Sequence, residues 1–119
     1  MIRNVLIVDD AQVDRAYLEQ ILSSAGYVVT LATSGSQAVD KAKRDKPDAI
    51  LMDVNMPDMD GFAATRALRN DSETKDIPIV FVTAKDQKAD RAWGQMLGAR
   101  GYVIKPYKSE QLLEQLRAL

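Results

Sequence analysis

The sequence of 119 residues contains no cysteine and no histidine. Without cysteine the chain forms no disulfide bonds, and nothing points to an oxidising compartment. Since cysteine and histidine are the usual ligands of zinc, copper and haem iron, sites for these groups are not expected. Any metal that the protein binds is therefore expected to be a hard cation held by oxygen atoms.

Long hydrophobic runs and an excess of charge of one sign are also missing. The N-terminal apolar run, "VLIV", is followed by two aspartates and does not resemble a signal peptide. No stretch approaches the roughly 20 apolar residues of a membrane helix. The net charge of −1 gives no general attraction to nucleic acid or anionic membranes. A cytoplasmic protein that binds neither nucleic acid nor membrane directly is expected.

What the sequence does have is a regular alternation of apolar runs and helical stretches. Strands are predicted over residues 4–8, 28–32, 49–53, 79–83 and 101–105. Helices are predicted over 12–25, 36–46, 62–69 and 88–97, and after Ser109. Continuous apolar runs between helices indicate strands that are buried on both faces, as in a parallel sheet. The pattern predicts a single α/β domain over residues 1–119, of (βα)₅ type, with no output domain after it.

The helix ends and faces carry their own signals. Gly26 and Gly98 suit the position just after a helix, and Ser109 suits the N-cap of the last one. The first helix is expected to bury one apolar stripe. Its members are Val13, Tyr17, Leu18, Ile21 and Leu22.

Acidic residues follow two of the predicted strands. Asp9 and Asp10 stand directly after the first, and Asp53 ends the third. In a parallel sheet, ligands bind beyond the carboxyl ends of the strands, so these carboxylates are expected to share one pocket. Three carboxylates do not stay ionised side by side without compensation. All-oxygen ligands suit Mg²⁺, which is the expected cofactor.

Two further residues at strand ends extend this chemistry toward phosphate. Thr83 ends the fourth strand and Lys105 ends the fifth. Because Mg²⁺ often binds a phosphate as an additional ligand, a hydroxyl and an ammonium nearby suit phosphoryl oxygens. One carboxylate then becomes a nucleophile that attacks phosphorus and forms an aspartyl phosphate. Asp53, on the expected central strand, is the best candidate.

Together these residues resemble response-regulator receiver domains, close to the stand-alone chemotaxis type. The resemblance rests on Asp9–Asp10, Asp53, "MPDMDG" at 56–61, Thr83–Ala84 and Lys105–Pro106, in this order. Residues 85–106, "KDQKADRAWGQMLGARGYVIKP", further resemble stand-alone receivers of type IV pilus and twitching systems. The resemblance implies a flavodoxin-like, doubly wound parallel sheet of five strands in the order 2-1-3-4-5.

The resemblance also implies roles for the acidic pocket. Asp53 is the phosphoacceptor and a ligand of Mg²⁺. Asp10 holds the metal directly, Asp9 holds it largely through water, and the backbone carbonyl of Asn55 completes the protein ligands. Thr83 binds a phosphoryl oxygen.

Further implied roles lie on the fifth strand and on the loop after the fourth. Lys105 binds a second phosphoryl oxygen, and its peptide bond to Pro106 is cis. Tyr102 is a switch coupled to Thr83, and Lys85, together with Asn55, tunes the lifetime of the phosphoryl group. The phosphoryl group comes from a sensor histidine kinase or a phosphotransfer protein. The chain is then a two-component phosphorelay switch that assists its own phosphorylation and dephosphorylation, not an enzyme. It changes protein–protein interactions through the helix 4, strand 5 and helix 5 face.

Other interpretations stay open at this point. An aspartate-nucleophile phosphatase for small molecules has a similar site, but carries an acid two residues after the nucleophile, where this chain has Asn55. A receiver that is never phosphorylated and acts only as a docking module is another alternative. Tyr102 is equally compatible with an ordinary strand aromatic, whereas for Trp93 a packing role is favoured over recognition of a partner. Asp58 and Asp60 suit turn chemistry, with Gly61 relieving backbone strain.

Overall fold

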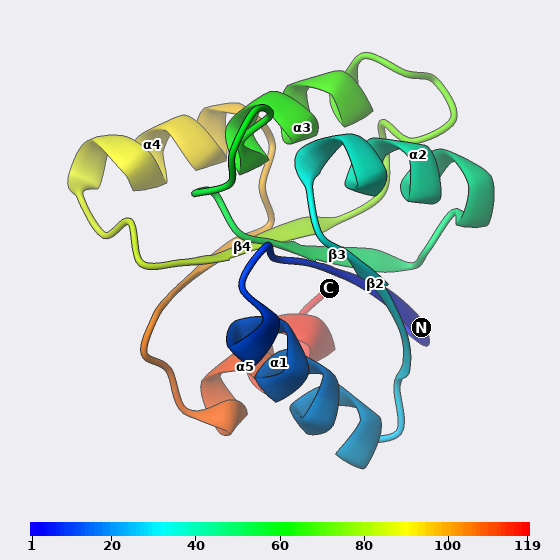
Figure 1. The fold of residues 1–119 in the computed structure, drawn as a ribbon, viewed down its shortest axis with the longest axis vertical. Coiled ribbons are helices and arrows are strands. Elements are labelled where there is room, and N and C mark those ends of the chain that lie inside the picture. Colours follow the sequence, from blue (N-terminus) through cyan, green and yellow to red (C-terminus); the bar gives the residue numbers. More distant parts are fainter.

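The computed structural model describes all of residues 1–119, and it contains five strands and five helices in strict alternation (Figure 1). The strands are β1 Asn4–Val8, β2 Val28–Ala32, β3 Ala49–Met52, β4 Ile79–Thr83 and β5 Gly101–Ile104. The helices are α1 Gln12–Ser24, α2 Gly35–Asp45, α3 Gly61–Arg69, α4 Lys88–Met96 and α5 Ser109–Arg117. All strands pair in parallel, in the order β2-β1-β3-β4-β5. The predicted fold class and strand order are confirmed.

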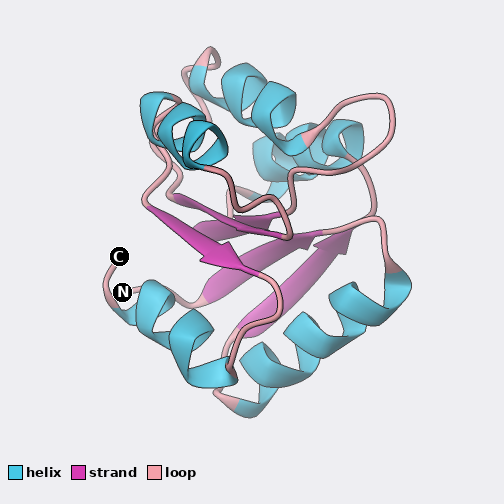
Figure 2. Ribbon diagram, turned by 90° about the vertical axis from the view of Figure 1, so that its left-hand side faces the viewer, coloured by secondary structure: helices cyan, strands magenta, loops and turns pink.

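Helices cover both faces of the sheet, which makes three layers (Figures 1 and 2). Helices α1 and α5 lie on one face, and α2, α3 and α4 lie on the other. Successive residues of one strand therefore enter two separate cores: Leu6 belongs to the α2–α3 side and Ile7 to the α1–α5 side. Burial of both faces explains why the strands read as continuous apolar runs. None of the helices is long and apolar enough to cross a membrane.

The pairing register brings the ends of β1 and β3 to the same level. Val8 is the partner of Met52, and the backbone N–H of Asp53 donates to the carbonyl of Val8 at 3.0 Å. Asp53 thus lies just past the end of β3, beside the residue that precedes Asp9. The sheet itself therefore places the two aspartates next to each other.

Most predicted boundaries agree with the structure to within one residue. Gly26 and Gly98 follow α1 and α4 with φ of +94° and +88°, the left-handed conformation that glycine adopts without strain. The N-cap of α5 was predicted wrongly. Ser109 is the first helical residue and Lys108 is the N-cap, because the side chain of Gln111 accepts the backbone N–H of Lys108 at 2.8 Å.

The predicted apolar stripe of α1 is only partly right. Leu18 and Leu22 are buried against the sheet, whereas Val13 is 81% exposed and Tyr17 is 47% exposed. At 3.6 residues per turn, Val13 lies roughly 140° around the helix from Leu18. It therefore faces solvent when Leu18 faces the core.

Candidate functional site

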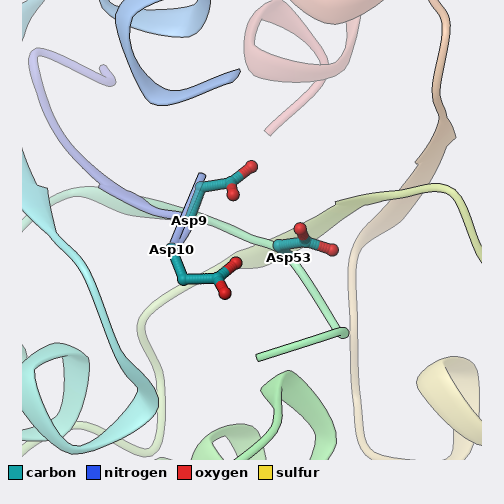
Figure 3. A group of neighbouring side chains, drawn as sticks. All are labelled: Asp9, Asp10 and Asp53. Carbon is teal, nitrogen blue, oxygen red and sulfur yellow. The ribbon is translucent and has the colours of Figure 1, made fainter. Parts of the chain in front are cut away.

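Three carboxylates meet at the carboxyl ends of β1 and β3. One oxygen each from Asp9, Asp10 and Asp53 lies within 4.8 Å of the others, and Figure 3 shows the three side chains side by side. Asp9 is fully buried, Asp53 is buried, and Asp10 is exposed. The group combines two buried acids with one that reaches the solvent.

Asp9 is held in place by its own loop. Its Oδ1 accepts the backbone N–H of Ala11 at 2.9 Å, and its carbonyl accepts from the guanidinium of Arg15 at 2.8 Å. The carboxylate of Asp10 is not held by any of these bonds. Removal of the Asp9 carboxylate would leave donors unpaired, whereas removal of the Asp10 carboxylate would not.

A single ammonium lies among the acids. The Nζ of Lys105 donates to Asp9 at 2.8 Å, to Asp14 at 3.0 Å and to Asp53 at 3.1 Å. Asp9 and Asp53 were predicted to lie in this pocket. Asp14, in the first turn of α1, was not predicted. The one sequence signal for Asp14 was its place in the first turn of the helix that directly follows the carboxyl end of β1.

The pKa values of Asp9 and Lys105 are both raised, for different reasons. Burial raises the pKa of Asp9, and the bonds from Lys105 and Ala11 only partly oppose this effect. Desolvation alone would lower the pKa of Lys105, but its three carboxylate neighbours more than offset this effect and hold that pKa above its ordinary value. The ammonium gains from three anions, whereas each anion shares one cation with the others.

Thr83 and Tyr102 meet at the backbone of Lys85. The hydroxyl of Thr83, which is fully buried, accepts the N–H of Lys85 at 3.3 Å. The hydroxyl of Tyr102 donates to the carbonyl of Lys85 at 2.8 Å, and its ring packs against Phe81. Burial raises the pKa of Tyr102 to about 12, so the phenol stays protonated and able to donate. One residue thus connects the two side chains that were expected to be coupled.

The remaining expected residues lie at the rim of the pocket. Asn55 is exposed and its N–H donates to Asp53 at 3.3 Å. The side chain of Lys85 contacts Asp90 at 3.7 Å rather than one of the three clustered acids. The peptide bond between Lys105 and Pro106 is cis.

The turn after β3 has a structural role that was predicted in part. Asp60 is the N-cap of α3 and accepts the N–H of Ala63 at 2.8 Å. Asp58 adopts a positive φ of 68°. Gly61 does relieve strain, but of a close contact and not of an unusual φ: a Cβ there would collide with the backbone carbonyl of Asp53. Gly61 therefore lets α3 begin directly against the phosphoacceptor candidate.

Trp93 takes part in packing and also keeps an exposed edge. It is 37% exposed, and the guanidinium of Arg66 lies 5.5 Å from the centre of its ring. The contact joins α3 to α4 on the surface. Trp93 is thus not brought into the acidic pocket.

The donor set at the pocket is chemically suited to a hard cation. All three side chains offer carboxylate oxygens, and Asp10 is open to solvent, which leaves room for water ligands. The acidic cluster of Asp9, Asp10 and Asp53 therefore fits a metal site.

Comparison with known proteins agrees with this picture. Residues 5–117 match the family model described as the response regulator receiver domain. Protein PilH of Pseudomonas aeruginosa is 44% identical over 115 residues, which are 97% of this chain and 95% of PilH. Response regulator MprA of Mycolicibacterium vanbaalenii is 42% identical over 115 residues, but these make up only 49% of that protein. PilH and this chain thus match over nearly their whole lengths.

Solved structures agree on the fold. The chemotaxis response regulator CheY4 of Vibrio cholerae has a TM-score of 0.92 at 36% identity, and the match covers 99% of this chain and 98% of CheY4. The receiver domain of the sensor histidine kinase PA1611 of Pseudomonas aeruginosa has a TM-score of 0.90 at 37% identity, with 99% and 97% covered. That structure has a magnesium ion coordinated in its active-site cleft. By sequence and by fold, the chain belongs to the response-regulator receiver domain family, and its resemblance to the stand-alone chemotaxis-like type is confirmed.

Proposed function

We propose that residues 1–119 work as one receiver domain that accepts a phosphoryl group on Asp53 and passes the signal to another protein. The observation that carries this proposal is the position of Asp53. It is buried, lies 3.1 Å from the ammonium of Lys105 and has two further carboxylates beside it. A buried acid with one shared cation is a good nucleophile for a phosphoryl group once a divalent cation offsets the remaining negative charge.

The phosphoryl donor is a phosphohistidine of a sensor histidine kinase or phosphotransfer protein. An oxygen of Asp53 attacks phosphorus and the P–N bond of the donor breaks. The electron pair of that bond stays with the imidazole nitrogen, which then takes a proton from solvent. Lys105 and Thr83, at two neighbouring strand ends, bind the phosphoryl oxygens. The reaction proceeds in the cytoplasm.

Mg²⁺ is the proposed metal, held by Asp10 and Asp53 directly, by Asp9 largely through water and by the backbone carbonyl of Asn55. When bound, the ion neutralises acidic charge and binds a phosphoryl oxygen. Support comes from the cluster of three carboxylates within 4.8 Å. The fold relative with a magnesium ion in its cleft supports the same choice of metal.

The signal is read on the face made by α4, β5 and α5. A phosphoryl oxygen attracts the hydroxyl of Thr83, which now accepts the N–H of Lys85. The loss of that bond shifts the loop whose carbonyl holds Tyr102. The phosphoryl group thereby biases two packings of Thr83, Lys85 and Tyr102, and a partner protein binds one of them better.

The first prediction concerns the site of phosphorylation. Acetyl phosphate with Mg²⁺ is expected to add one phosphoryl group to the wild-type protein, measured as intact mass. Asp53→Asn is expected to add none, because the amide is not a nucleophile. Asp58→Asn is the matched control, since asparagine tolerates the left-handed φ at that exposed turn. Uptake by Asp53→Asn at the wild-type rate would contradict the assignment, and a wild-type protein that takes up nothing would be a docking module only.

The second prediction separates metal binding from stability. Asp10→Asn is expected to lose Mg²⁺ binding in calorimetric titration, while the metal-free protein stays as stable or gains about 0.5 kcal/mol from reduced repulsion. Asp9→Asn is expected to lower the free energy of unfolding in urea by about 1–3 kcal/mol, because an amide N–H₂ would face Lys105. The assignment fails if Asp10→Asn binds Mg²⁺ normally or unfolds.

The third prediction concerns the switch. Beryllofluoride stands in for the phosphoryl group on aspartate. Its binding, followed by fluorine NMR, is expected to change amide hydrogen exchange between Thr83 and Tyr102. Amide exchange in α2 serves as the internal control, because this helix is not part of the proposed path. Unchanged exchange from Thr83 to Tyr102 in the fully occupied protein would rule out this path.

The fourth prediction concerns the lifetime of the phosphoryl group. Lysine has no acceptor to orient an attacking water, and Lys85 can leave Asp90 for a phosphoryl oxygen. A partly exposed pair of this kind is worth about 0.2–1 kcal/mol, so Lys85→Glu is expected to hydrolyse its aspartyl phosphate about two- to five-fold faster. The hydrolysis rate of Lys85→Ala should lie between those of the wild type and Lys85→Glu.

The lifetime is measured as loss of the phosphoryl label in Mg²⁺-saturated protein without a phosphatase. Lys88→Glu makes the same change of charge at an exposed position of α4 and should hydrolyse like wild type. Equal lifetimes for all the variants would mean that Lys85 stays with Asp90.

A further inference from the structure

Asp14 shares the cation on which the proposed reaction depends. An ammonium has three donors, and in Lys105 all three are taken by carboxylates: Asp9, Asp14 and Asp53. Asp9 and Asp53 belong to the acidic cluster. Asp14 lies outside the cluster, on α1, and has no assigned role.

The three hydrogen bonds of Lys105 differ in how much free energy it costs to break them. Asp9 is fully buried, so breaking its bond would leave a carboxylate without solvent to replace the donor. The side chain of Asp14 is 46% exposed, and water can take the place of Lys105. When Lys105 turns toward a phosphoryl group on Asp53, the bond to Asp14 is therefore the one that loosens at least cost.

The surroundings leave room for Asp14 to move. A groove of about 560 Å³ runs beside the site, with Asp14, Lys105 and Tyr107 among its walls. The carboxylate of Asp14 can thus swing into this groove without repacking the core. Asp9 has no such freedom, because its other oxygen accepts the N–H of Ala11.

We propose that Asp14 is a positioning residue that competes with the phosphoryl group for the ammonium of Lys105. The inference rests on the proposed function of Asp53. While the bond to Asp14 persists, Lys105 is drawn toward α1, and a fourth negative charge stays near the acceptor. Both effects lower the affinity of the site for a phosphoryl group.

The test uses beryllofluoride and the chain of residues 1–119 at saturating Mg²⁺. Asp14→Asn is expected to bind beryllofluoride about two- to five-fold more tightly in calorimetric titration, as suits the loss of one partly exposed competing pair. Asp14→Glu keeps the charge and is expected to restore the wild-type affinity. Glu19→Gln removes the same charge from another position of α1 that does not contact Lys105, and should leave the affinity unchanged.

A spectroscopic readout shows whether the effect runs through Lys105. The ¹⁵N resonance of the Lys105 ammonium, assigned by its loss in Lys105→Arg, is expected to shift in Asp14→Asn and to stay in place in Glu19→Gln. Wild-type affinity in Asp14→Asn, or an unshifted ammonium resonance, would overturn the role of Asp14 alone. A wild-type protein that binds no beryllofluoride would overturn the proposed function of Asp53 and this inference with it.

Discussion

The site depends on the ammonium of Lys105, because it is the one cation that donates hydrogen bonds to the buried carboxylates of Asp9 and Asp53. Its three partners are all distant from Lys105 in the chain: Asp9 follows β1, Asp14 is in α1, and Asp53 follows β3. One positive charge is shared by three anions, and it does not fully offset the burial that raises the pKa of Asp9. Any added cation or anion at this edge of the sheet must therefore redistribute the bonds of Lys105.

The sequence indicates the fold and the centre of the site well because both depend on strong, local patterns. Strands covered on both faces must be apolar throughout, so β1 and β4 are visible as runs and end where polar residues begin. Asp9 and Asp53 follow from these ends, since a parallel sheet brings them to one edge. The strand order came from the family resemblance, because apolar runs alone do not say which strands are neighbours.

What the sequence did not indicate depends on side-chain direction and on close contacts. Asp14 meets Lys105 only because α1 starts with that face toward β5, and the pattern of α1 was ambiguous: Val13 and Tyr17 repeat at helical spacing as well as Leu18 and Leu22 do. Gly61 is visible as a turn glycine. The sequence does not show that a side chain at this position would collide with the carbonyl of Asp53, because that contact forms only when the start of α3 packs against the end of β3.

The backbone and the side chain of Lys85 make separate sets of contacts. Its N–H meets Thr83 and its carbonyl meets Tyr102, whereas its side chain reaches Asp90. Every residue type except proline offers the same N–H and carbonyl, so the mechanical link between the two hydroxyls does not depend on which amino acid stands there. Under the proposed function, the duration of a response and its transmission are therefore separable traits, and a single substitution at position 85 changes the duration without rebuilding the path of transmission.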